Sequence, residues 1–202
     1  MLFLNYETII DPILKDIREL VVKTSGMKAG DKALDVCCGT GAQSLIYARH
    51  GVTSSGIDNN PDMIAIANKN KARCKLGNAS FILGDAGELP YGDNNFDYVS
   101  VSFAIHDKEG DLKDKIIGEM KRVVKDKGTL IFIDFNTPLP GSAYGLMVRL
   151  VEFLAGGSHY QGFKEYNSSG GLDMLVKEHN LCIKSRDSLK KGIAIIVTAQ
   201  KN

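Results

Sequence analysis

Short apolar runs alternate with segments of helical periodicity along most of this chain, and this alternation limits the folds that it can adopt. The runs at 32–36, 52–57, 80–83, 98–103 and 129–135 have the length and composition of strands. Strands that alternate with helices favour a doubly wound α/β sandwich, in which helices cover both faces of a mostly parallel sheet. The run 129–135 is nearly continuously apolar, which predicts an interior strand.

Several residues mark the expected helix ends. Asp11 and Pro12 predict an N-cap and a first helical position, and Asn60 with Pro61 predicts the same for a later helix. A third amphipathic helix follows the fourth strand, and Lys127-Gly128 is expected to close it.

The last two predicted strands differ from the others in how they are connected. The runs at 181–185 and 193–199 are separated only by the polar stretch 186–192, which is too short for a crossover helix. We therefore expect an antiparallel hairpin at one edge. The complete prediction is a seven-stranded, mostly parallel, Rossmann-like sheet.

Length and charge restrict the organisation and the partners. A chain of 202 residues with 44% hydrophobic residues is typical of one domain, so we expect 1–202 to be a single domain with an N-terminal helical cap at 1–28 and an insertion or lid at 138–170. A net charge of +1 makes nucleic acid an improbable substrate. No apolar run is long enough for a membrane span.

The four cysteines are expected to be free thiols in a reducing cytoplasm. They occur at Cys37, Cys38, Cys74 and Cys182, without a paired C-x-x-C spacing and without a signal peptide at the N-terminus. Adjacent cysteines chelate metals poorly, so no metal is predicted.

The loop after the first strand is the expected ligand site, because ligands of open parallel sheets lie beyond the carboxyl ends of the strands. Asp35, Cys37, Gly39 and Gly41 occupy alternate positions there. A dinucleotide site would need a third glycine where Ser44 stands, so the loop favours another nucleoside-bearing ligand. Asp35 would repel a pyrophosphate but attract an amino group such as that of a methionine moiety.

Two further carboxylates follow later strands. Asp58 ends the second strand about 20 residues beyond the first loop, at the position where a carboxylate accepts the ribose hydroxyls. Asp85 ends the third strand in the stretch Gly84-Asp85-Ala86, where it is placed to accept from an adenine amino group. The alternative for Asp58 is a helix cap, and for Asp85 a polar turn.

These segments, in their order and spacing, resemble the motifs of class I methyltransferases. The matching stretches are Leu34 to Gly41, Gly56-Ile57-Asp58, Gly84 to Pro90, Asn95-Phe96-Asp97 and Gly128-Thr129-Leu130. Among such enzymes the chain looks most like the ubiquinone/menaquinone C-methyltransferase group and its small-molecule relatives. The match covers roughly residues 30–136, and residues 169–175 show a weaker similarity to a late helix of the family.

The resemblance implies S-adenosyl-L-methionine as cofactor, S-adenosyl-L-homocysteine as product, and roles for named residues. Asp35, Gly39 and Gly41 would hold the methionine part, Asp58, Asn59 and Met63 the ribose and adenine face, Asp85 and Ala86 the adenine, and Ser102 and Phe103 would lie near the sulfonium. Cys37 stands where the family more often has glycine, a departure that the pattern tolerates.

Methyl transfer depends mostly on aligning donor and acceptor and on excluding water. A phenol, hydroquinone or amine acceptor must also lose a proton. His106, just after the fourth strand, is the candidate general base. The alternative is that His106 only hydrogen-bonds backbone at the strand end.

The acceptor site is expected where the resemblance is weakest, in the N-terminal helix and residues 138–170. The apolar helix there is a candidate lid over an apolar or aromatic acceptor, a homodimer contact or part of the core, and core packing is favoured. Its apolar residues are Tyr144, Leu146, Met147, Leu150, Val151, Phe153 and Leu154, and the stretch after it carries His159, Tyr160, Phe163 and Tyr166. Tyr6 is a candidate for closing over the cofactor.

The predicted function is therefore methyl transfer to a small-molecule acceptor. A non-catalytic S-adenosylmethionine-binding module with a protein partner is the main alternative, and a nicotinamide-dependent oxidoreductase is a weaker one. The sequence lacks the signature motifs of enzymes that methylate amides, adenine nitrogens or the C5 atom of pyrimidines.

Overall fold

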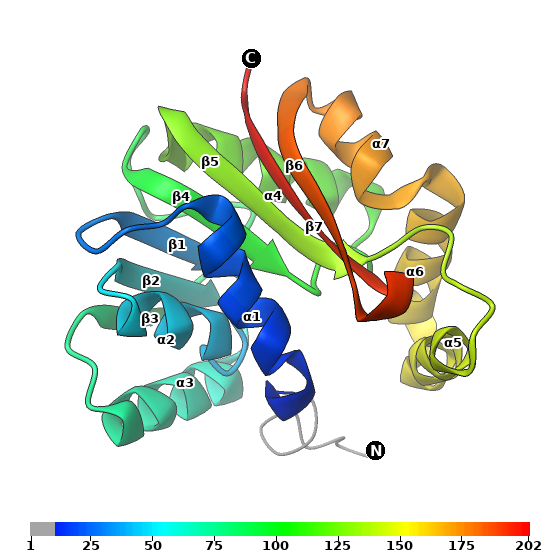
Figure 1. The fold of residues 1–202 in the computed structure, drawn as a ribbon, viewed down its shortest axis with the longest axis horizontal. Coiled ribbons are helices and arrows are strands. Elements are labelled where there is room, and N and C mark those ends of the chain that lie inside the picture. The colour runs from blue at the N-terminus through cyan, green and yellow to red at the C-terminus, as the bar shows by residue number, and fades with distance from the viewer. Residues whose placement is uncertain (1–10) are drawn as a thin grey trace.

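The structure, a computed structural model, describes residues 11–202 and contains one seven-stranded sheet (Figure 1). The strands are β1 (Lys32–Val36), β2 (Thr53–Asp58), β3 (Ala79–Leu83), β4 (Phe96–Ser102), β5 (Val124–Phe135), β6 (Leu181–Leu189) and β7 (Ala194–Lys201). They are arranged in the order β3-β2-β1-β4-β5-β7-β6. Strand β7 runs antiparallel to both of its neighbours, β5 and β6, and its pairing with β6 confirms the predicted antiparallel edge hairpin. The strand order reverses between β1 and β4, so their carboxyl ends form the switch point of this sheet.

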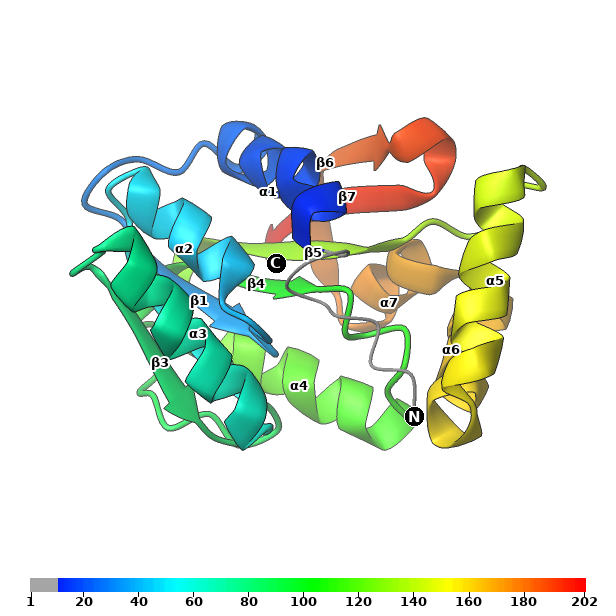
Figure 2. The same ribbon diagram turned by 90° about the horizontal axis from the view of Figure 1, so that it is seen from below.

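Seven α-helices accompany the sheet in the described residues: α1 (Asp11–Ser25), α2 (Ala42–Arg49), α3 (Pro61–Cys74), α4 (Gly110–Val123), α5 (Ala143–Ala155), α6 (Gly157–Ser169) and α7 (Gly171–Glu178). Figure 2 shows α1 and α2 on one face of the sheet and α4 and α7 on the other, with α5 and α6 side by side at one side of the molecule. Their positions confirm the doubly wound architecture. No helix in residues 11–202 is long and apolar enough to cross a membrane.

Strand β5 shows why a continuous apolar run was required. Leu130 and Phe132 pack in a core cluster with residues of α4 and α7, whereas Ile131 and Ile133 pack in a second cluster with residues of α1. All four side chains are fully or almost fully buried. Both faces of this strand are therefore covered, as two-sided helix packing demands.

The helix boundaries agree with the sequence at α3 but not at α4. Asn60 caps α3 by accepting a hydrogen bond from the Asp62 amide. Helix α4 ends at Val123, four residues before the predicted stop at Lys127-Gly128, so that prediction was wrong. The amides of Asn94 and Asn95 donate to the carbonyls of Arg122 and Val123, and the chain then enters β5 directly. These two hydrogen bonds from the residues just before β4 satisfy carbonyls of the last helical turn, which explains the early stop.

Helix α5 contradicts the expectation of core packing. Its large apolar side chains are mostly exposed, as the fractions of 60% for Tyr144, 59% for Phe153 and 72% for Leu154 show. The long side chain that α5 does bury is that of Glu152. The core interpretation holds instead for the next helix, where Phe163 and Tyr166 are buried. The helix α5 lies beside α6 away from the sheet, which leaves its apolar surface without a sheet to cover it.

Tyr6 and residues 1–10 of the predicted N-terminal cap lie outside the described residues. The prediction of a single domain with an insertion at 138–170 stays a prediction.

Candidate functional site

A cavity of about 400 Å³ opens beside the carboxyl ends of β1, β2, β3 and β4, at the switch point. Ten of the eleven residues predicted to bind the cofactor line it: Asp35, Cys37, Gly39, Asp58, Asn59, Met63, Asp85, Ala86, Ser102 and Phe103. Residues more than sixty positions apart in the sequence thus contribute to one cavity. The place of this cavity is the one that the topology predicts for a ligand.

Asp35 is the most deeply buried acid of the cavity, with 1% of its surface exposed. Its carboxylate accepts hydrogen bonds from the hydroxyls of Ser44, at 2.9 Å, and Ser100, at 3.1 Å. Burial raises its pKa to about 6, although both hydrogen bonds and the nearby Arg18 act in the opposite direction. An ionised Asp35 is therefore costly in the free protein, and a cationic ligand group would relieve this cost.

Asp58 connects the end of β2 with the loop after β1. One carboxylate oxygen accepts from the Gly39 amide at 2.8 Å, and the other accepts from the Asn60 amide at 2.9 Å. These two backbone donors fix the orientation of the carboxylate in the cavity wall. The residue is therefore not the N-cap of α3, a position that Asn60 fills.

Asp85 lies in the loop after β3. Its Oδ1 accepts from the Gly87 amide at 2.8 Å, so the side chain shapes its own turn, as the polar-turn alternative predicted. It also lines the cavity together with its neighbour Ala86. The two interpretations of Asp85 are compatible, because a carboxylate has a second oxygen for a ligand.

The strands on either side of the switch point end in the same unusual backbone conformation. Cys37 follows β1 with a φ of 56°, and Phe103 follows β4 with a φ of 50°. A residue that has a side chain adopts this left-handed region only at a cost in free energy. This cost is a physical reason why glycine is favoured at the position of Cys37. Burial raises the pKa of the Cys37 thiol to about 12, so the thiol stays protonated and is not a nucleophile.

Two features test whether this cavity fits an adenosyl ligand with an amino-acid tail. A Cβ on Gly39 would meet no atom within 4 Å, so the backbone there is open to close approach. The Ser102 hydroxyl is buried at the cavity and has no hydrogen-bond partner among residues 11–202. With the carboxylates of Asp35 and Asp58, the wall offers acceptors for an ammonium group and for paired hydroxyls. The residues present fit S-adenosylmethionine.

Gly41 and His106 are the two predicted site residues that do not line the cavity. Gly41 serves packing instead: its φ is 75°, and a Cβ there would lie 2.5 Å from the Cζ atom of Phe81. It is required for the close contact of α2 with β3. The predicted direct role of Gly41 toward a ligand has no support from this position.

His106 is 4% exposed and precedes Asp107 and Lys108, which do line the cavity. Its Nδ1 donates to Asp134 at 2.6 Å, and its Nε2 lies 3.7 Å from Glu152. Burial alone would lower the pKa of the imidazole, but Asp134 and then Glu152 and Asp107 raise it above the ordinary value. His106 therefore belongs to a buried polar cluster rather than to a simple backbone contact. Its role as a general base stays a prediction.

Sequence reasoning missed several residues of the wall. Arg18 comes from α1, Gln43 from the first turn of α2, and Asp107 and Lys108 from the loop after β4. The Lys108 ammonium and the Asp107 carboxylate form an ion pair at 2.5 Å. Lys108 and Asp107 follow His106 directly, and that adjacency was the available signal. Arg18 carried none, because its approach to the cavity depends on how α1 packs.

Comparison with known proteins identifies the relatives of this fold. A family model described as "Methyltransferase domain" matches residues 27–183. The chain is 33% identical over 159 residues to a demethylmenaquinone methyltransferase of Oceanobacillus iheyensis, an alignment that covers 76% of this chain and 66% of that protein. It is 30% identical over 182 residues to the enzyme of the same name from Shouchella clausii, with coverage of 87% and 74%.

A solved structure shares the fold over most of its length. The crystal structure of a SAM-dependent methyltransferase from Aquifex aeolicus superimposes with a TM-score of 0.69, at 19% identity, over 94% of this chain and 97% of that one. The alignments with the two demethylmenaquinone methyltransferases span about two thirds and three quarters of those relatives.

Proposed function

Because this chain belongs to the class I S-adenosylmethionine-dependent methyltransferases, we propose that it methylates a small apolar or aromatic acceptor, namely a hydroquinone, a phenol or an amine. The observation that carries the proposal is the convergence of Asp35, Asp58 and Asp85 on one cavity at the switch point. Each comes from the end of a successive strand, β1, β2 and β3. The names of the two relatives, which specify a quinone acceptor, support the hydroquinone in particular.

The cofactor would be held by residues with distinct tasks. Asp35 would bind the ammonium group of the methionine part, and Asp58, fixed by the Gly39 and Asn60 amides, would accept from the ribose hydroxyls. Asp85 and Ala86 would face the adenine, with Asn59 and Met63 beside it. When bound, S-adenosylmethionine supplies a methyl carbon that its positive sulfur activates toward displacement.

The chain's own contribution to the reaction is orientation and exclusion of water. Phe103 and Ala104 form an apolar part of the wall near the Ser102 hydroxyl, so they would keep water away from the reacting end of the cavity. Arg18 lies near Asp35 in the same wall and would pair with the carboxylate of the methionine part.

Exposed apolar side chains of α5 support an apolar acceptor. They lie on the insertion at 138–170, where the acceptor site is proposed, and they include Leu146, Met147 and Leu150. A side chain of this kind gains free energy by covering an apolar ligand, because both lose contact with water.

The test is an acceptor screen with S-adenosylmethionine that carries a labelled methyl group. Hydroquinones, phenols and amines are compared, and we expect label in a hydroquinone or phenol product. An Asp58→Ala variant should lose both cofactor binding and transfer. Tight binding of S-adenosylhomocysteine without transfer to any acceptor would contradict the enzymatic proposal in favour of a binding module.

A further inference from the structure

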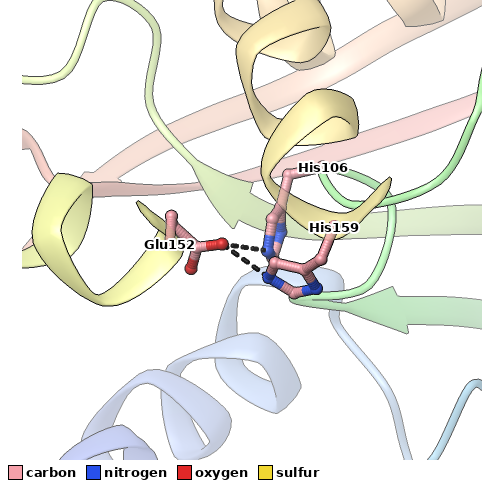
Figure 3. A group of neighbouring side chains, drawn as sticks. All are labelled: His106, Glu152 and His159. Carbon is pink, nitrogen blue, oxygen red and sulfur yellow. Dashed lines mark hydrogen bonds and ion pairs between the residues drawn. The ribbon is translucent and has the colours of Figure 1, made fainter. Parts of the chain in front are cut away.

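A cluster of two histidines and one glutamate lies beside the cofactor cavity, at the junction of three segments. His106 follows β4, Glu152 belongs to α5, and His159 belongs to α6 (Figure 3). One nitrogen or oxygen atom from each lies within 4.8 Å of those of the other two. Nothing in the proposed methyl transfer requires the three residues to meet.

In each histidine, the ring nitrogen that points away from Glu152 contacts a different carboxylate. His106 Nδ1 donates to Asp134 at 2.6 Å, and His159 Nδ1 lies 3.0 Å from Asp107. A proton on Nδ1 of each ring satisfies these contacts and turns Nε2 toward Glu152. A metal ion would take the place of the proton that His159 Nε2 donates to Glu152 at 2.6 Å, because metal binding to histidine releases protons. Carboxylates placed on the distal nitrogen are the usual second partners of metal-binding histidines, because they fix the tautomer and the ring orientation.

The two Nε2 atoms then converge on one oxygen of Glu152. This Oε2 atom lies 2.6 Å from His159 Nε2 and 3.7 Å from His106 Nε2. The dashed lines in Figure 3 mark these two contacts. Two imidazole nitrogens with one carboxylate form the three-ligand set found in zinc enzymes that keep a fourth position open.

Burial makes the arrangement costly without a cation. His106 and Glu152 are 4% and 6% exposed, the Asp134 carboxylate contacts His106, and the Asp107 carboxylate contacts His159. Lys108 is a cation near these carboxylates, and it forms an ion pair with Asp107. Concentrated negative charge in a buried region requires compensation by bound protons or by a metal ion.

Helix α5 supplies the independent observation. It exposes its large apolar side chains but buries Glu152, its one carboxylate. The hydrophobic effect alone would orient this helix the opposite way. Attraction of Glu152 to the two histidines accounts for the observed orientation.

We propose that His106, Glu152 and His159 form a binding site for a divalent transition-metal ion of the zinc type. The imidazole ligands select such an ion over Mg²⁺ and Ca²⁺, which prefer oxygen ligands throughout. The His159 side chain is 36% exposed and lines a hollow on the surface beside Asp107 and Lys108, so the fourth coordination position has access to water or to an acceptor oxygen. Binding would also fasten α5 and α6 to the loop after β4.

The test uses the complete chain, freed of any affinity tag and stripped with a chelator. Zn²⁺ binding is measured by calorimetry, and the bound metal is counted by elemental analysis after dialysis. We expect equimolar binding that excess Mg²⁺ does not displace. Co²⁺, as a spectroscopic substitute, should give bands of nitrogen and oxygen ligands without a thiolate charge-transfer band. Weak, superstoichiometric binding or a thiolate band would overturn the proposal.

Variants locate the site. Glu152→Gln and His159→Ala should each weaken Zn²⁺ binding at least about 100-fold, and Asp107→Asn about 10- to 100-fold. His179→Ala is the matched control, because His179 pairs with the exposed Asp114 at 3.1 Å, far along the chain from the cluster, and it should bind as the original protein does. Equal weakening in the control would contradict the assignment. Circular dichroism confirms that each variant is folded.

A structural readout separates metal binding from activity. Zn²⁺ should slow amide hydrogen exchange in α5 and α6 of the original protein but not in Glu152→Gln. Unchanged exchange in the Zn²⁺-loaded original protein would contradict a site that joins these helices to β4. Neither measurement depends on methyl transfer, so failure of the proposed function would leave this test intact.

Discussion

The Gly39 amide donates a 2.8 Å hydrogen bond to the Asp58 carboxylate, which joins the loop after β1 to the end of β2. These residues are 19 positions apart, and both line the cavity. The bond turns a carboxylate that would otherwise be mobile into a fixed acceptor. Preorganisation of this kind lowers the entropy cost of binding a ligand.

The Asp58→Ala change should therefore weaken binding of S-adenosylhomocysteine strongly. Loss of the carboxylate removes charge-assisted hydrogen bonds to the ribose, and we expect about 100-fold weaker binding, or about 2.7 kcal/mol. Calorimetry measures the effect. Asp62→Ala is the control, since Asp62 is exposed in the first turn of α3, and a loss below about threefold in Asp58→Ala would contradict the ribose role.

The pKa of Asp35 predicts how cofactor affinity depends on pH. Burial raises this pKa to about 6, so the free protein protonates Asp35 as the pH falls below that value. The ammonium group of S-adenosylhomocysteine requires the ionised form, so the affinity should fall up to about tenfold per pH unit below 6 and level off above it. Calorimetry from pH 5 to 7.5 measures this. Asp35→Asn should bind S-adenosylhomocysteine weakly and without this pH dependence. An affinity of the original protein that rises on acidification would contradict the role of Asp35 in binding the ammonium group.

The same carboxyl group should reduce the stability of the free protein at neutral pH. Because the folded-state pKa lies above the unfolded value of 3.8, the stabilising effect of the protonated form is complete below about pH 4 and is lost as the pH rises through 6. The difference corresponds to at most roughly 3 kcal/mol. Urea unfolding of the original protein and Asp35→Asn, without ligand, should show the variant gaining relative stability between pH 4 and 7. A constant difference would refute this linkage.

Two glycines of one loop should respond differently to alanine. At Gly41 the added Cβ would lie 2.5 Å from Phe81, with φ at 75°, so Gly41→Ala should cost about 2 kcal/mol or more of unfolding free energy. At Gly39 the Cβ meets no protein atom but enters the cavity wall, so Gly39→Ala should cost only about 1 kcal/mol and weaken the cofactor more. Thermal unfolding and calorimetry compare the pair, and the reverse ranking would contradict these roles.

The general-base prediction for His106 is tested in metal-free enzyme, where Nε2 is unliganded. A general base contributes about 10²- to 10⁴-fold, so His106→Ala should lower kcat by that factor at saturating cofactor. A loss of less than about tenfold, in a variant that still binds S-adenosylhomocysteine normally, would assign proton removal to another group or to water.

The sheet and its cavity were predictable because they depend on local patterns. Asp35, Asp58 and Asp85 each end an apolar run, and parallel strands bring such ends to one edge. The helix stop after Val123 was missed because backbone donors from residues 94 and 95 decide it, and these are distant in sequence.

The histidine cluster was beyond sequence reasoning for a similar reason. Only His106 stood near a recognisable strand end. Glu152 and His159 lie on an apolar helix and its neighbour, and nothing in their spacing shows that α5 turns its acid inward. The orientation of α5 follows from partners on other elements, so an amphipathic pattern alone predicted the wrong buried face.

The outward orientation of α5 has a consequence for how such a chain diversifies. Since Tyr144, Leu146, Leu150 and Leu154 contribute little to the two large core clusters, substitutions there carry a small folding penalty. Mutation can therefore explore new surfaces on this helix while β1 to β5 keep their arrangement. Single substitutions on α5 can therefore change which molecules this surface contacts, without compensating changes in the sheet.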